Sequence, residues 1–320
     1  MKVTLLGCGR WGSFIAWYLN RNGHDVCVWG KGGRPEVESL FSTRKNEYVE
    51  FPESIALTND LQEAVSHADN IIISISSQAV RDLMQDVVKC NGVFDKNFIL
   101  CMKGIEEDTG KRLSEVLIDS GIDPMHIAVW VGPGHIQEFT RGVPNLMIID
   151  SYNRNLSKFL IDNFKSDLIR YYQGEDIIGT EIGASAKNVM GIAAGMLDGG
   201  NLKVLKGALM ARGAREVSRL IKAAGGNELS AYGLCHLGDY EATLFSEFSH
   251  NRRFGEAYVK GEKFEKLAEG VKTSTALLNL ADRLGVEMPI TKAVNDIIIN
   301  QKDAKKVLMA LFSRTNLNEF

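Results

Sequence analysis

Short apolar runs, each about as long as one β-strand, recur along the first half of the chain. They predict strands at 2–6, 25–29, 70–75, 97–102, 126–131 and 145–150. Between the runs, apolar residues at three- and four-residue spacing predict helices at 11–23, 77–89 and 110–121. The strands are continuously apolar rather than alternating, which is typical of a mostly parallel sheet covered on both faces.

From about residue 176 onward the pattern changes to helices alone. The segments 204–226 and 271–285 have helical apolar spacing and end at glycine. The chain therefore predicts an α/β fold, with a Rossmann-like domain over 1–176 followed by an all-helical domain over 177–320. Its 320 residues also favour two domains over one core.

One predicted helix, residues 181–196, places a single lysine among Gly, Ala, Ile, Val and Met. Lysine is rarely buried, because its ammonium loses water at a cost of several kcal/mol unless it is paired. In one interpretation, Lys187 lays its stem along apolar surface and keeps its charge in water. In the other it is a functional residue, which its position near the predicted domain junction favours.

Composition excludes several classes of partner. The net charge of −3 provides no basic field for nucleic acid or an anionic membrane. The apolar runs are too short to cross a bilayer, and the first residues do not resemble a signal peptide. Five scattered cysteines without a C-x-x-C pair suit a reducing cytoplasm. We therefore expect a cytoplasmic protein.

Gly7, Gly9 and Gly12 form a G-x-G-x-x-G sequence between the first predicted strand and the first predicted helix. In that context the pattern indicates a dinucleotide site, with the diphosphate at the helix N-terminus. The alternative is a glycine turn that binds nothing.

The residues after the second predicted strand bear on the choice of cofactor. An NAD-selective site usually has an acidic residue there for the ribose 2′-hydroxyl. This chain instead has Lys31 and Arg34, while Asp25 comes too early and Arg10 adds a third cation. We therefore expect NADPH as the preferred cofactor, with NADH as a second option. The alternative is that these are solvated loop charges.

Motifs along nearly the whole chain identify a family resemblance. They are the Trp11–Gly12 pair, MKGIE around Lys103, and the segments 131–150, 181–189, 237–243, 249–255 and 285–290. In this order and spacing they resemble bacterial NAD(P)-dependent glycerol-3-phosphate dehydrogenase. The resemblance implies reversible reduction of dihydroxyacetone phosphate to sn-glycerol 3-phosphate, which supplies glycerophospholipid synthesis, without a metal. It implies a small-molecule substrate, and a homodimer is one option for the assembly.

The resemblance makes Lys187 the proton donor and acceptor. Burial near a second cation lowers a lysine pKa toward working pH, which suits this role. Lys103 would be that cation, or else a solvated loop lysine. Asp239 would accept from the substrate hydroxyl or orient Lys187, or else cap a helix.

The resemblance and the local chemistry together predict two sets of binding residues. Those for the cofactor are Gly7, Gly9, Arg10, Trp11, Gly12, Lys31, Tyr48, Lys103, Ile136, His250, Arg252 and Glu269. Those for the substrate are Lys103, Gly132, Gly134, Lys187, Asn188, Asp239, Thr243, Ser249, His250 and Asn251.

The chain departs from the family pattern on the substrate side. His250 replaces an arginine of the phosphate site, and Gly134 replaces a serine or threonine. Histidine is mostly neutral above about pH 6.5, whereas arginine is always charged. The expected activity is glycerol-3-phosphate dehydrogenase, with weaker or pH-dependent phosphate binding. The alternatives are a related dehydrogenase for another small hydroxy compound and a weakened nucleotide-binding homologue that acts as a sensor.

Overall fold

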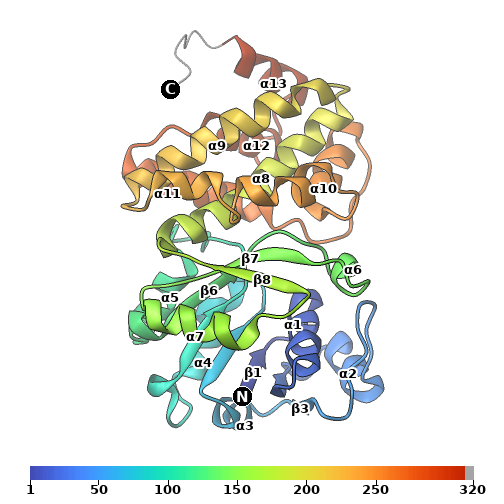
Figure 1. The fold of residues 1–320 in the computed structure, drawn as a ribbon. Coiled ribbons are helices and arrows are strands. Elements are labelled where there is room, and N and C mark those ends of the chain that lie inside the picture. Colours follow the sequence, from blue (N-terminus) through green and yellow to red (C-terminus); the bar gives the residue numbers. More distant parts are fainter. Residues whose placement is uncertain (314–320) are drawn as a thin grey trace. The chain divides into compact units, whose positions relative to one another are not determined.

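All six predicted strands are present in the computed structural model, which describes residues 1–313 (Figure 1). The strands are β1 (Lys2–Leu6), β2 (Asp25–Trp29), β3 (Ala56–Thr58), β4 (Asn70–Ile73), β5 (Asn97–Leu100), β6 (Ile127–Val131), β7 (Asn145–Ser151) and β8 (Ile169–Gln173). The sequence pattern missed β3 and β8. β3 has only three residues, and β8 alternates between buried and exposed side chains at the sheet edge.

The strands form one sheet in the order β3-β2-β1-β4-β5-β6-β7-β8. Every neighbouring pair is parallel except β6 with β7, so the prediction of a mostly parallel sheet is confirmed. In the β1–β2 register, Leu6 lies opposite Trp29. The loops that follow these two strands, which begin at Gly7 and Gly30, therefore leave the same edge of the sheet.

Helices lie on both sides of this sheet (Figure 1). They are α1 (Arg10–Arg21), α2 (Pro35–Thr43), α3 (Leu61–His67), α4 (Val80–Val87), α5 (Leu113–Asp119), α6 (Ile136–Phe139) and α7 (Arg154–Phe164). The rings of Phe14 and Phe139 stack at 5.0 Å, and the Tyr18 hydroxyl donates to the Phe164 carbonyl. These contacts join α1 to α6 and α7 across long sequence separations.

The chain divides into two compact units. The first contains Met1–Met102 and Leu113–Ile177, and the second contains Lys103–Arg112 and the chain from Ile178 onward. Compared with a division at 176/177, the first unit gains Ile177 and the second gains the segment Lys103–Arg112. Ile105 is fully buried in the core of the second unit, and Arg283 donates to the Thr109 carbonyl.

From Ile178 to residue 313 the second unit consists of helices and their connecting segments, as predicted. The α-helices are α8 (Ile177–Gly199), α9 (Lys206–Ala223), α10 (His250–Lys260), α11 (Gly270–Leu284), α12 (Pro289–Ile298) and α13 (Ala304–Phe312). A 3₁₀ turn (Leu237–Asp239) and a π-helix (Glu241–Phe245) precede α10. Among residues 1–313, none of the helices has the length and apolar character needed to cross a membrane.

Close contact between α8 and α10 depends on glycines. A Cβ added at Gly195 would lie 1.8 Å from the Arg252 carbonyl oxygen, and one added at Gly255 would lie 2.1 Å from that of Ile192. Neither position can hold a side chain unless the two backbones separate. The small residues around Lys187 therefore bring α10 against the helix that carries it.

We expect Gly195→Ala to destabilise the protein by about 3 kcal/mol or more, because its methyl group would meet backbone rather than a movable side chain. The matched control is Gly207→Ala in α9, where an added Cβ has no atom within 4 Å. That change should be neutral or slightly stabilising, since alanine favours helix. Urea unfolding of both variants measures the difference, and equal stabilities would contradict the packing argument.

Candidate active site

The glycine loop has the backbone geometry of a phosphate cradle. Gly7 has φ +114°, and a Cβ there would lie 2.3 Å from the Ser74 carbonyl oxygen. A Cβ at Gly12 would lie 2.2 Å from the Gly7 carbonyl oxygen, whereas the space beside Gly9 is open. Because Gly9 is the N-cap of α1 and has no side chain, it leaves the first N–H groups of the helix accessible to an anion.

Two residues predicted to contact the cofactor lie together beside this loop. The Arg10 guanidinium lies 5.3 Å from the centre of the Tyr48 ring and donates to Gln137 at 3.2 Å. Trp11 packs 6.2 Å from Phe139 in α6, the helix that begins at the buried Ile136. The first unit thus brings Tyr48 and Ile136 to the loop, although neither belongs to the glycine motif.

The cations after β2 are exposed. Lys31 follows Gly30 directly, and Arg34 is the N-cap of α2. Burial raises the pKa of the Cys8 thiol in the glycine loop, and Arg34 acts against that rise, which places its charge near the loop. No acidic residue occupies positions 30–34.

Gly132 and Gly134, predicted to contact substrate, also lie in the first unit. Gly134 has φ +134°, and a Cβ there would lie 2.4 Å from the Phe139 ring. A serine or threonine would be strained at this position. The glycine is therefore matched to the local backbone and to Phe139.

In the second unit, two lysines share one carboxylate oxygen. Asp239 Oδ2 lies 2.8 Å from Lys187 Nζ and 2.7 Å from Lys103 Nζ. The side chains are 1% exposed for Asp239, 10% for Lys187 and 18% for Lys103. The interpretation of Lys187 as a surface residue is therefore wrong, and Asp239 is not a helix cap.

The surroundings of Lys187 lower its pKa to about 8, mainly through burial. The Asp239 carboxylate opposes this effect, and the Lys103 ammonium adds to it. At neutral pH the lysine is mostly protonated, yet it gives up its proton far more readily than an ordinary lysine.

A π-helix places a hydroxyl on the same ammonium. Lys187 Nζ donates to Thr243 Oγ1 at 2.8 Å. The next residue, Leu244, accepts at its carbonyl from the buried Lys206, which also pairs with Asp198 at 2.7 Å. The sequence analysis missed Lys206 and Asp198. Lys206 did not stand out, because Lys203, Arg212 and Arg215 are nearby in its segment.

Residues 249–251, predicted to bind the substrate phosphate, lie close to α8, the helix that carries Lys187. A Cβ at Gly191, one turn after Lys187, would lie 3.3 Å from Asn251 Cβ. Asn251 Oδ1 accepts from the Gly270 N–H at 3.0 Å, and Asn188 donates to the Lys103 carbonyl at 3.1 Å. Ser249 caps α10, and the His250 ring packs edge-on 6.3 Å from Phe264.

Glu269, predicted to contact the nucleotide, lies within electrostatic reach of both lysines. Burial raises the pKa of its carboxyl, and the charges of Lys187 and Lys103 oppose this rise. Lys103, Lys187 and Glu269, all predicted as site residues, therefore belong to one electrostatic cluster in the second unit.

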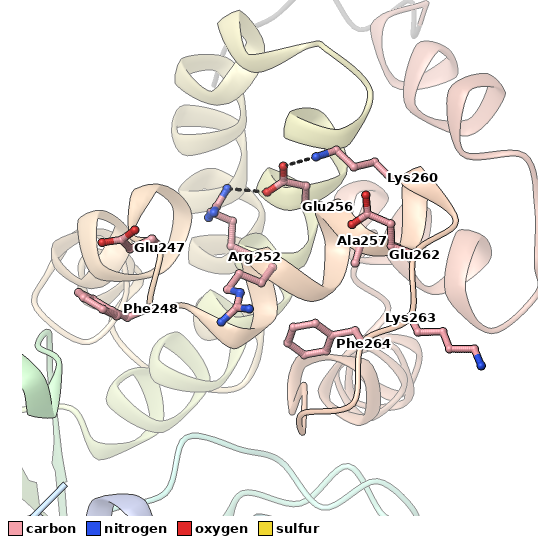
Figure 2. A pocket seen from close by; sticks show the side chains of 10 residues that line it. Glu247, Phe248, Arg252, Glu256, Ala257, Lys260, Glu262, Lys263 and Phe264 are labelled. Atoms are coloured by element: carbon pink, nitrogen blue, oxygen red, sulfur yellow. Dashed lines mark hydrogen bonds and ion pairs between the residues drawn. The ribbon is translucent and has the colours of Figure 1, made fainter. Parts of the chain in front are cut away.

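Arg252 has acidic partners within its own unit. It lies 2.6 Å from Asp198 and 3.1 Å from Glu256, which in turn pairs with Lys260. Figure 2 shows Arg252, Glu256 and Lys260 beside a hollow of about 510 Å³ along α10. Because both acids already engage its guanidinium, the predicted nucleotide contact gains no support from the described residues.

The predicted site residues thus form two groups, one in each unit. Those of the first unit are Gly7, Gly9, Arg10, Trp11, Gly12, Lys31, Tyr48, Gly132, Gly134 and Ile136. Those of the second are Lys103, Lys187, Asn188, Asp239, Thr243, Ser249, His250, Asn251, Arg252 and Glu269. Within residues 1–313, His, Cys, Asp and Glu side chains do not gather in groups of three or more that could hold a metal ion.

The two charges beside Lys187 should move its pKa in opposite directions. Asp239→Asn should lower it below about 8, because the carboxylate stabilises the ammonium, and Lys103→Met should raise it. NMR titration of isotope-labelled lysine measures both. Glu228→Gln, which removes the exposed partner of Lys222, is the control and should change nothing. Shifts of the same sign in the two site variants would contradict this electrostatic account.

Two family models match the chain. The one described as the NAD-dependent glycerol-3-phosphate dehydrogenase N-terminus matches residues 2–157, and the one for the C-terminus matches residues 176–309. Proteins named glycerol-3-phosphate dehydrogenase (NAD(P)+) from Prosthecochloris aestuarii and a Thermoanaerobacter species are each 36% identical. The alignments cover 98% of this chain and 98% of the first relative, and 100% of this chain and 99% of the second.

A solved structure of glycerol-3-phosphate dehydrogenase from Coxiella burnetii has a TM-score of 0.90 and 27% identity, over 98% of this chain and 99% of that one. The expected Rossmann-like fold, the dependence on NAD(P) and the resemblance found in the sequence are thereby confirmed. The chain belongs to the NAD-dependent glycerol-3-phosphate dehydrogenase family and is an oxidoreductase.

Proposed function

We propose that this chain reversibly reduces dihydroxyacetone phosphate to sn-glycerol 3-phosphate and that Lys187 exchanges the proton. The observation that carries the proposal is the buried Lys187 ammonium, 2.8 Å from Asp239 and beside a second lysine, in a chain of this family. The product would supply glycerophospholipid synthesis. A cytoplasmic location is part of the proposal, supported by five cysteines that are all thiols; a homodimer remains an option for its assembly.

The first unit is proposed to bind the cofactor. The loop from Gly7 to Gly12 fits a diphosphate, because Gly7 and Gly12 allow its tight backbone path, the space beside Gly9 is open, and the α1 N-terminus lacks a side-chain cap. Arg10, Tyr48 and Ile136 would line the nucleotide beside it. The chemistry that a bound reduced nicotinamide supplies is hydride transfer to the substrate carbonyl carbon.

The second unit is proposed to supply the proton. As the carbonyl oxygen gains negative charge, Lys187 Nζ donates a proton to it, and the Lys103 ammonium stabilises that charge. Asp239 holds both ammonium groups, and Asn188 holds the backbone at Lys103. In the reverse direction, neutral Lys187 accepts the hydroxyl proton.

The substrate phosphate is proposed to lie at the start of α10, against Ser249, His250 and Asn251. This helix begins at His250, and its first N–H groups favour an anion. A histidine in place of arginine makes phosphate binding weaker as the imidazole loses its proton, since neutral imidazole lacks the charge that arginine keeps.

We expect Lys187→Met to lower kcat by about 10²–10⁴-fold, because the general acid is lost, while fold and cofactor binding persist. The control is Lys203→Met at an exposed lysine of the same unit. NADPH absorbance with a panel of small ketones measures turnover and tests the alternative substrates. Retention of more than about a tenth of wild-type kcat would place the acid elsewhere.

NADPH is the proposed preferred cofactor, on the strength of Lys31, Arg34 and the lack of an acidic residue at 30–34. We expect Lys31→Glu to raise KM for NADPH about tenfold and KM for NADH much less, because its carboxylate would repel the 2′-phosphate. The control for charge reversal is Lys2→Glu, at the start of β1, the end of the strand opposite to the glycine loop. Equal effects on the two cofactors would remove Lys31 from the ribose site.

A further inference from the structure

A buried His–Tyr pair flanks Asp239 in sequence and contacts the helix that carries Lys187. His236 is fully buried and Tyr240 is 1% exposed, with ring centroids 4.8 Å apart. His236 Nδ1 lies 2.8 Å from the Gly183 carbonyl oxygen, and His236 Nε2 lies 2.6 Å from the Tyr240 hydroxyl. The sequence analysis did not select either residue.

The two partners determine which ring nitrogen carries the proton. A carbonyl only accepts, so Nδ1–H must donate to Gly183. Burial lowers the pKa of His236 to about 4 and raises that of Tyr240, so the ring is neutral and the phenol is protonated. The Tyr240 hydroxyl therefore donates to Nε2, and both ring nitrogens have partners.

The carbonyl that His236 engages belongs to the helical turn of Lys187. Gly183 precedes Lys187 by four residues in α8, so its carbonyl is the helical acceptor for the Lys187 backbone N–H. The carbonyl of His236 itself accepts from the Asp239 N–H at 3.0 Å. One residue thus joins the backbone of the lysine to the backbone of its carboxylate partner.

Close packing restricts movement at this junction. A Cβ at Gly183 would lie 3.2 Å from His236 Cβ and 2.9 Å from Cys235 Sγ. Gly183 therefore lets the His236 segment approach α8 closely, and the hydrogen bond fixes its register along the helix.

We infer that His236 is a positioning residue that holds Lys187 and Asp239 in register through the Gly183 carbonyl, with Tyr240 holding the imidazole. The inference rests on the proposed role of Lys187 as proton donor. His236 does not donate a proton to substrate, since it is completely buried and both its nitrogens are engaged.

Three substitutions test the two hydrogen bonds of the imidazole separately. His236→Asn places an amide N–H where Nδ1 lies and keeps the bond to Gly183. His236→Gln reaches the Tyr240 hydroxyl but gives up that bond. Tyr240→Phe keeps the imidazole and its volume while removing its second partner.

The readout is kcat for reduction against pH, with KM for substrate and the melting temperature measured on the same samples. Among residues 1–313, the charged and titratable groups near Lys187 are Asp239, Lys103, Glu269 and His236. Asp239 contacts the Lys187 ammonium, and Lys103 shares the same carboxylate oxygen. If the register loosens, Asp239 stabilises the ammonium less. The pH above which kcat falls should then move down from about 8.

We expect His236→Gln to lower kcat about tenfold and to shift this pH downward, with KM little changed. His236→Asn should keep the wild-type pH profile even if it melts earlier, and Tyr240→Phe should shift the profile in the same direction as Gln but less. A wild-type profile in Gln, or equal profiles in Gln and Asn, would overturn the inference. If the His236 variants do not fold, a wild-type profile in Tyr240→Phe overturns it.

The failure of the inference can be told from failure of the proposed function. If Lys187→Met keeps turnover, Lys187 is not the acid and the proposed function fails. If Lys187→Met is inactive while His236→Gln behaves as wild type, the acid stands and only the positioning role fails.

Discussion

The helical unit depends on one carboxylate that neutralises two buried ammonium groups. Asp239 is 1% exposed and contacts both Lys187 and Lys103. Removing one partner of a buried ion pair commonly costs about 3–5 kcal/mol, because the other charge is left without compensation. Here the two cations repel each other and the anion attracts both, so the site holds a lysine that is charged and close to losing its proton. That balance suits the proposed reversible reaction, in which the same group gives and accepts a proton.

This balance requires short and constant distances, which the packing around α8 provides. Glycines at 191, 195 and 199 face α10 and the segment before it, where added Cβ atoms would come within 3.0 Å of their neighbours. Direct backbone contact leaves little freedom for a helix to shift. The cost of such glycines is a weaker intrinsic helix preference. Tertiary packing, rather than propensity, therefore maintains this helix and the position of its lysine.

Most strands of the sheet followed from periodicity, because buried parallel strands are continuously apolar, and helical spacing located α1, α4, α5, α8, α9 and α11. The short β3 and the alternating β8 lacked that pattern and were missed. Lys187 stood out as the one lysine among small and apolar residues, and the glycine loop by its place after the first strand. Tyr48, Glu269 and Asn251 came only from the family resemblance, since nothing in their local sequence marks them. His236 and Tyr240 could not be found from the sequence, because the inferred role of His236 depends on a hydrogen bond to the Gly183 carbonyl, 53 residues away.

The segment Lys103–Arg112 belongs to the helical unit, although the chain on both sides of it belongs to the first unit. This has a consequence for biosynthesis. Lys103 precedes Asp239 by 136 residues. It is therefore translated long before its partner, as is Ile105, whose place in the core exists only when the later helices have formed. During synthesis this segment has no core to pack into at the time when β5 and β6, which flank it in sequence, can already pair. In the nascent chain the later helices thus cover one apolar side chain, Ile105, in an otherwise charged segment. The order of translation therefore separates assembly of the sheet from completion of the lysine cluster.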